Sequence, residues 1–206
     1  MILKVNATRM ELLRLKKRLV LARRGYDLLK RKQDELMRQF LELLENIGNL
    51  RNDIETRIAA AHRSFLMARS VMDRESMEEA IMFPNQKLTL NVATVPVMSL
   101  RLPRFEVRSE GKVYSYGLLN TSAELDSALG DYSELLPEML RLAEIERSVE
   151  LLATEIEVTR RRVNALEYIL IPNLRDTIKY IRMRLDEMER SNLSRLMRVK
   201  EIVRSH

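Results

Sequence analysis

The stretch TRRRVNALEY, residues 159–168, lies in the middle of a long run of sequence with few helix breakers. Its apolar-facing positions Thr159, Val163 and Leu166 are four and three residues apart, the spacing of the seam of a coiled-coil helix. The three arginines at 160–162 fall between these positions and should face outward. A seam of this kind needs a second helix to cover it, and the N-terminal part of the same chain is the predicted partner.

This seam continues in both directions with a spacing near 3.5 residues. Between Leu166 and Ile178 the spacing is four residues three times in succession, and Pro172 lies inside that interval. Such a stutter locally unwinds a supercoil, and a proline removes one helical hydrogen bond. We therefore expect a bend near Ile171–Pro172 and no helix end. The seam comprises Leu135, Met139, Leu142, Ile145, Val149, Leu152, Ile156, Val163, Leu166, Leu170, Leu174, Ile178, Ile181, Leu185, Met188, Leu196 and Val199.

A second seam occupies the N-terminal part of the chain. Thr8 followed by Glu11 is a capping box, which satisfies two unpaired amides at a helix start. A seam this long predicts a left-handed coiled coil, and helices of about 65 to 75 residues would be on the order of 100 Å long. The seam comprises Leu12, Leu15, Leu19, Ala22, Tyr26, Leu29, Leu36, Phe40, Leu43, Ile47, Leu50, Ile54, Ile58, Ala61, Phe65, Ala68 and Met72.

The centre of the chain has a different pattern. Alternating apolar residues at 88–92 and a β-branched run at 95–102 predict two or three short strands, with a turn at 109–112. Residues 120–129 then predict a short helix stopped by Gly130. The second long helix should begin between Ser133 and Pro137.

These elements predict a mainly α fold. It is a long antiparallel two-helix left-handed coiled coil with a small central β-hairpin and short-helix segment, and both termini lie at the same end. The expected divisions are residues 1–82 for the N-terminal long helix, 83–133 for the central segment and 134–206 for the C-terminal long helix. Gly25 and Gly48 interrupt the first helix, which indicates either close approach of another helix or simple tolerance of glycine.

Composition excludes several kinds of chemistry. The chain has no cysteine, so it can hold neither a disulfide nor a thiolate metal site, and this fits a reducing, cytoplasmic compartment. Two histidines are too few for a zinc site, and the five glycines form no phosphate-binding loop. No window approaches the roughly 18 apolar residues of a membrane span. We expect no catalytic residue, no cofactor, no metal and no direct membrane insertion.

The charges are segregated along the chain. Residues 1–32 carry eleven Lys or Arg against two acidic residues, and residues 190–204 carry five against one, whereas residues 124–157 hold ten acidic residues and two arginines. An antiparallel hairpin would gather the basic segments at one tip. Solvated helix faces, an acidic protein socket or a nucleic acid would each explain them. A basic-tipped helical hairpin that binds nucleic acid or acts as a scaffold therefore remains the alternative function.

Three stretches resemble a known family: NATRMEL at 6–12, GYDLLKRKQDEL at 25–36, and residues 159–168 followed by Ile171–Pro172. They resemble the D subunit of the bacterial and archaeal V-type (A-type) ATPase/ATP synthase. The likeness covers nearly the whole chain and is weakest in the central segment. Ala7 stands where the family pattern leads us to expect proline, which affects only the position of the helix start.

The resemblance implies a non-catalytic rotor shaft in the central stalk of a rotary motor. The shaft would couple ATP hydrolysis or synthesis to rotation of a membrane ring and to proton (hydrogen ion) or sodium transport. The implied partners are the hexamer of catalytic A subunits and B subunits, together with the F and C subunits of the central stalk, and no nucleic acid. The implied location is cytoplasmic and peripheral to the membrane, in the V1/A1 sector. The hexamer-contact residues would be Arg9, Arg14, Lys17, Arg18, Arg24, Lys30, Arg160, Arg161, Arg162, Arg195, Arg198 and Lys200.

Overall fold

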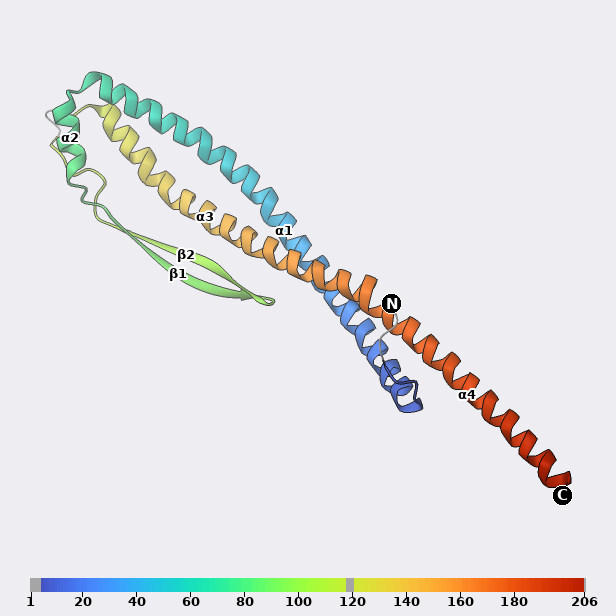
Figure 1. The fold of residues 1–206 in the computed structure, drawn as a ribbon. Coiled ribbons are helices and arrows are strands. Elements are labelled where there is room, and N and C mark those ends of the chain that lie inside the picture. The colour runs from blue at the N-terminus through green and yellow to red at the C-terminus, as the bar shows by residue number, and fades with distance from the viewer. Residues whose placement is uncertain (1–4, 118–120, 206) are drawn as a thin grey trace. The chain divides into compact units, whose positions relative to one another are not determined.

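The computed structural model describes residues 5–117 and 121–205. The chain divides into two compact units, which we call unit 1 (residues 1–36 and 156–206) and unit 2 (residues 37–155). A mainly α fold with a two-stranded antiparallel β-hairpin is confirmed (Figure 1). The elements in chain order are α1 (Arg9–Val71), α2 (Arg74–Met82), β1 (Lys87–Val97), β2 (Leu100–Glu110), α3 (Ala123–Asn164), the π-helix η1 (Ala165–Leu170) and α4 (Ile171–Ser205).

The N-terminal helix forms where its sequence predicts. The Glu11 amide donates a hydrogen bond of 3.2 Å to Thr8 Oγ1, so Thr8 caps α1. Every residue of the predicted N-terminal seam is buried or half-buried. α1 ends at Val71, and α2 begins after two further residues. Residues 5–82 therefore contain two helices.

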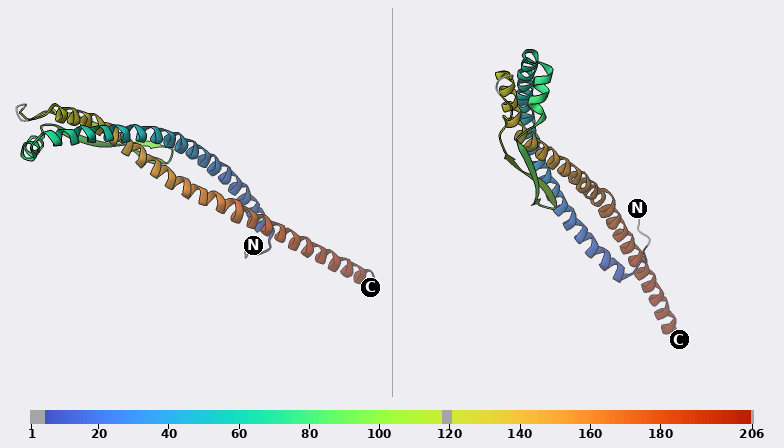
Figure 2. Two further views of the ribbon diagram at one scale, coloured as in Figure 1. Left: turned by 90° about the horizontal axis from the view of Figure 1, so that it is seen from above. Right: turned by 90° about the vertical axis from the view of Figure 1, so that its left-hand side faces the viewer.

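Within each unit, α1 runs antiparallel to a C-terminal helical segment (Figures 1 and 2). In unit 1, Leu15 and Ala22 of α1 share a core with Ile171, Leu174 and Ile181 of α4. Arg9, which precedes these α1 residues, pairs with Glu189, which follows these α4 residues, so the two helices run antiparallel.

Unit 2 shows the same direction through polar contacts. Arg57 of α1 bonds Glu138 of α3, and further along α1 the imidazole of His62 contacts the hydroxyl of Tyr132. A higher residue number on α1 thus pairs with a lower residue number on α3, so these two helices also run antiparallel.

The predicted start of the second long helix, between Ser133 and Pro137, is wrong. α3 begins at Ala123 and continues through Gly130 and Pro137 to Asn164, so no separate short helix ends at Gly130. The predicted first residue of that short helix, Asn120, lies outside the described residues.

Tertiary packing explains why α3 is continuous. Leu125 and Ala128 in its first turns are completely buried, and Leu125 belongs to a core cluster with Ala68, Met77 and Ala80. This burial offsets the cost of about 1 kcal/mol for an interior glycine. A Cβ atom on Gly130 would lie 3.2 Å from the hydroxyl of Tyr114, so this glycine makes room for the tyrosine.

The chain remains helical through Pro172, as expected, and the irregularity takes the form of the π-helix η1. The Ile171 amide donates to the carbonyl of Leu166, five residues back. A π turn accommodates one residue more than an α turn. Val163 before η1 and Ile171 after it are therefore both buried, although eight residues separate them.

The β-hairpin turns at Met98–Ser99 and not at residues 109–112. β1 and β2 pair in an antiparallel register from Lys87↔Glu110 to Val97↔Leu100, and Met98 has a φ of 53°. Residues 113–116, where a further strand was possible, form none. Gly111 marks the exit from β2: its φ is 100°, and a Cβ there would lie 2.1 Å from the Asn85 carbonyl oxygen, so only glycine fits.

Candidate partner-binding surfaces

The C-terminal end of α4 extends beyond the helix that covers the rest of its seam. Arg9, the first residue of α1, forms an ion pair with Glu189 of α4. From Asn192 to Arg204 every side chain is exposed, and we call residues 190–204 the free end of α4. Leu196 and Val199, which the sequence pattern placed in the seam, are therefore not in a core; Leu196 is 65% exposed. Met188 and Met139 are also largely exposed.

The early start of α3 accounts for the free end. The second long helix was expected from residue 134, but it begins at Ala123, eleven residues earlier. The two segments pair antiparallel, so the end of α1 pairs with the start of α3. Each residue added at the start of α3 therefore pairs with a residue of α1 that would otherwise pair with a later part of the second segment. The last turns of α4 then have no part of α1 opposite them.

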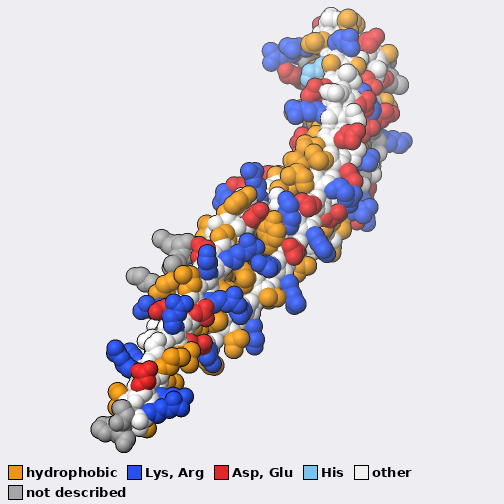
Figure 3. All heavy atoms as spheres, turned by 90° about the vertical axis from the view of Figure 1, so that its right-hand side faces the viewer, with side chains coloured by type: hydrophobic (Ala, Val, Ile, Leu, Met, Phe, Trp, Pro, Cys, Tyr) orange, Lys and Arg blue, Asp and Glu red, His pale blue; other side chains and the backbone are white. Residues whose placement is uncertain are grey.

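The free end mixes apolar and cationic side chains. Arg195, Arg198 and Lys200 are exposed, and none of them pairs with a carboxylate in the described part of the chain. The space-filling view shows cationic and apolar side chains intermixed along this helix (Figure 3). This composition suits a partner that offers both apolar surface and carboxylates. The exposed apolar residues include Leu193, Leu196, Met197, Val199 and Val203.

The outer face of α1 in unit 1 has the same mixed character. The six predicted contact residues on it, Arg9, Arg14, Lys17, Arg18, Arg24 and Lys30, are all exposed. Arg14 lies 3.8 Å from Glu11, and Lys30 lies 3.6 Å from Asp34. Exposed ion pairs of this kind contribute little, so these cations are available to a partner. Between them lie the exposed apolar residues Met10, Leu13, Val20, Leu21 and Leu28.

The arginine band at 160–162 lies near the end of α3, in the same unit. All three arginines are exposed, and Arg161 pairs with Glu157 one turn earlier. Five residues after Arg162, Glu167 of η1 lies near the hydroxyl of Tyr26 of α1. Partial burial raises the pKa of Tyr26 above its ordinary value, and the Glu167 carboxylate raises it further. Unit 1 therefore holds all twelve predicted contact residues.

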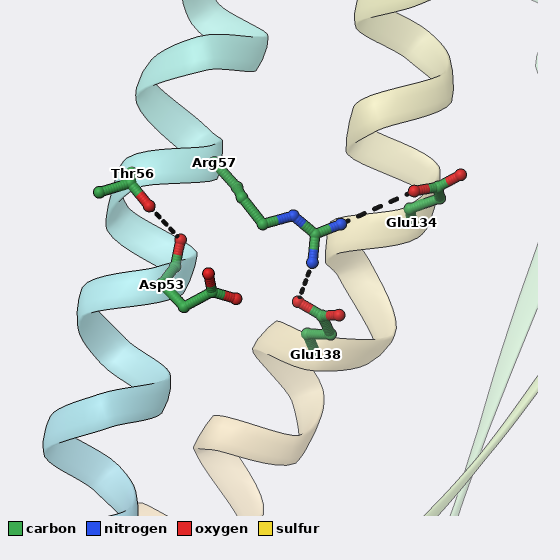
Figure 4. Close-up of polar contacts among 5 residues, drawn as sticks. All are labelled: Asp53, Thr56, Arg57, Glu134 and Glu138. Carbon is green, nitrogen blue, oxygen red and sulfur yellow. Dashed lines mark hydrogen bonds and ion pairs between the residues drawn. The ribbon is translucent and has the colours of Figure 1, made fainter.

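Unit 2 has a different polar surface. Arg57 of α1 reaches across to α3, where it bonds Glu138 at 2.5 Å and lies 3.7 Å from Glu134 (Figure 4). The hydrogen bond to Glu138 raises the pKa of Arg57 above its ordinary value. These contacts link α1 to α3 within unit 2.

The hairpin is fastened to the same unit. The Phe105 amide of β2 donates to the Glu144 carboxylate at 2.7 Å, and Ser99 in the turn donates to Glu155 at 3.3 Å. β1 keeps exposed apolar residues on its outer side, including Val92. A cavity of about 850 Å³ opens between the last turns of α1 and α2, lined by Phe65, Met72, Met77 and Met82 among others.

Across residues 5–117 and 121–205, no three His, Asp or Glu side chains come together as metal ligands would. Nor does any helix in that part of the chain combine the length and the apolar character that crossing a membrane requires.

The sequence pattern missed the exposed apolar residues of these surfaces. Leu193, Met197 and Val203 lie among the predicted basic contacts, and Tyr168 and Ile169 follow the arginine band. The seam pattern cannot identify them, because long coiled-coil helices also carry single apolar residues outside the seam. The sequence alone does not show which of these contribute to a contact surface. Their exposure became evident only when the pairing register was known.

Comparison with known proteins agrees with the resemblance. A family model that describes the D subunit of ATP synthase matches residues 11–201. The chain is 53% identical over 206 residues to the V-type ATP synthase D subunit of Acetivibrio thermocellus, covering 98% of this chain and 93% of that protein.

Two further relatives carry the same name. The Thermoanaerobacter sp. (strain X514) protein is 52% identical over 201 residues, covering 97% of this chain and 96% of that protein. The Clostridium novyi protein is 52% identical over 206 residues, with 98% and 95% covered. Both the family model and these relatives match nearly the whole chain, so the chain belongs to the family of ATP synthase D subunits.

Proposed function

We propose that this chain is the central rotor shaft of a V-type ATPase or ATP synthase. The free end of α4, the outer face of α1 and the arginine band would engage the inner surface of a ring of A and B subunits. The F and C subunits would bind elsewhere on the chain, within the central stalk. The chain itself would catalyse nothing.

One observation carries this proposal. The free end of α4 exposes at least five large apolar side chains together with five cations, and α1 does not extend far enough to cover them. Exposed apolar residues gathered on one helix mark an interaction site. A protein partner is favoured over nucleic acid, because interfaces with nucleic acid are more polar and more strongly cationic than this surface.

The proposed mechanism is mechanical coupling. A shaft with unequal faces would present different contacts to three otherwise equivalent catalytic sites, so its rotation would change their relative affinities for nucleotide. Sequential hydrolysis would in turn drive rotation. The rotation would serve transport of protons or sodium by a membrane ring, with this chain peripheral to the membrane.

Reconstitution with A and B subunits tests the proposal. We expect the wild-type chain to bind the assembled ring, and cysteines introduced at exposed positions of the free end, such as Ser194, to cross-link to its inner surface. The triple variant Arg195→Ala/Arg198→Ala/Lys200→Ala should bind several-fold more weakly, with a reduced dependence on salt.

A matched control removes the same charge from unit 2. The variant Arg51→Ala/Arg63→Ala/Arg69→Ala loses three exposed cations of α1 and should bind the ring as the wild type does. Absence of ring binding by the wild-type chain, or cross-links only to the outer surface of the ring, would refute the proposed function.

A further inference from the structure

The π-helix η1 places two large apolar residues side by side in solvent. Tyr168 is 71% exposed and Ile169 is 61% exposed, and no residue of η1 is buried. Single π turns inside α-helices frequently occur at functional sites. Val163 and Ile171 on either side of η1 are buried, so Tyr168 and Ile169 are exposed on a turn that the flanking helix anchors.

The other side of the turn is held by α1. The carboxylate of Glu167 lies near the hydroxyl of Tyr26 and contributes to its raised pKa, so the Glu167 side chain faces α1. Ile169 follows two residues later and therefore points to the far side of the turn. With Glu167 on the side of η1 that faces α1, Ile169 is directed away from α1.

Cations frame this apolar pair along the helix. Arg160 and Arg161 are exposed and lie about two turns before it, and Asn164 and Ala165 between them and the pair are exposed too. Arg175 lies about two turns after Tyr168 and is not fully buried. An apolar centre between positive ends matches an apolar pocket with a carboxylate rim.

We propose that Tyr168 and Ile169 form a knob that inserts into an apolar, carboxylate-rimmed pocket on the ring subunits surrounding the shaft. This inference rests on the proposed function, and it adds a specific anchor to the arginine band. The knob supplies the desolvated centre of the contact, and the arginines supply its charged rim. Tyrosine is among the residues that most often carry the binding energy of an interface.

The double variant Tyr168→Ser/Ile169→Ser tests the knob. Serine has a helix propensity similar to those of isoleucine and tyrosine, so α3, η1 and α4 should keep their helicity by circular dichroism. We expect the variant to bind the reconstituted ring of A and B subunits at least roughly 30-fold more weakly, the effect of losing one interface anchor. Tyr26→Phe, which keeps the knob but releases Glu167, should weaken binding less.

A matched control is available in unit 2. Leu66 and Met67 are also consecutive, and they are 60% and 62% exposed. The variant Leu66→Ser/Met67→Ser should bind the ring as the wild type does. If the wild-type chain binds the ring and both double variants bind equally well, the knob is refuted while the rotor function stands. If the wild-type chain does not bind the ring, the proposed function itself fails.

Discussion

Leu174 and Leu196 occupy equivalent positions in the seam pattern, yet the structure gives them opposite environments. Leu174 is completely buried, whereas Leu196 on the free end of α4 is 65% exposed. Truncation of each to alanine should therefore have very different effects on stability. The comparison tests the correction that the structure makes to the sequence pattern.

The expected magnitudes follow from the surroundings. Leu174 packs in the cluster formed with Leu15, Ala22, Ile171 and Ile181, and Leu→Ala at such a site costs about 2 to 5 kcal/mol. We expect a value near the lower half of that range, about 3 kcal/mol, because a layer of two helices relaxes more easily than a thick core. Leu196→Ala removes no buried contact and should change the free energy of unfolding by less than about 0.5 kcal/mol.

Amide hydrogen exchange at several urea concentrations is the suitable assay. It reports opening residue by residue, and therefore reads unit 1 separately from unit 2. Leu174→Ala should speed exchange throughout the helices of unit 1. A loss of about 2 kcal/mol or more in Leu196→Ala, or of less than about 1 kcal/mol in Leu174→Ala, would refute the pairing register.

Three further predictions concern single side chains. Gly48→Ala should stabilise the chain by about 0.5 to 1 kcal/mol in urea unfolding, because alanine is the better helix former and no described atom lies within 4 Å of the added Cβ. Destabilisation would mean that the site is crowded. Tyr116 donates a hydrogen bond of 2.5 Å to Asp126, and burial together with this bond raises the pKa of Tyr116 well above its ordinary 10.0. The unfolded chain therefore releases this proton at lower pH than the folded chain, so the free energy of unfolding should fall as pH rises above about 10. Tyr116→Phe should reduce this fall. An equal dependence of the free energy of unfolding on pH in both proteins would contradict the assignment. Arg57→Met should lower the melting temperature of the chain, less so at high salt, because the Arg57 contacts with Glu134 and Glu138 are partly exposed. Arg51→Met, which loses only a pair with Glu55 along the same helix, is its control and should leave the melting temperature nearly unchanged.

The long helices were predictable because one physical requirement repeats along them. Each seam residue must face the partner helix, and alternation of three and four residues reports this directly. The start of α1 was predictable for a local reason: the Thr8 side chain accepts a hydrogen bond from the amide of Glu11, only three residues along the chain. Neither inference needed knowledge of distant contacts.

The errors came from residues whose meaning depends on distant contacts. Gly130 appeared to end a helix, but it accommodates Tyr114, and Pro137 is carried within α3, where Leu125 and Leu135 are buried. Met98–Ser99 lacks the Asn-Gly or Asp-Gly pair that marks a two-residue hairpin turn. The stutter at Leu166 was visible, but a spacing of four residues does not distinguish a bend from a π turn.

The candidate contact residues show the same division. The charges of Arg160–Arg162 and of the free end could be read directly from the sequence, and all of them are exposed. The apolar residues beside them could not be assigned, since exposure depends on where α1 begins and where α3 begins. A shift of eleven residues in one helix start, from residue 134 to Ala123, decided which leucines are core and which are surface.

The free end of α4 also has a thermodynamic consequence. It is a helical segment of about four turns that lies beyond the part of α4 paired with α1, and isolated helices shorter than about 12 to 15 residues are marginal in water. Its backbone order in the isolated chain thus depends on propagation from the paired part of α4. A partner that encloses this segment would suppress its fraying, so part of the binding energy would be used to order the helix. Binding would therefore carry a large unfavourable entropy and a negative heat-capacity change.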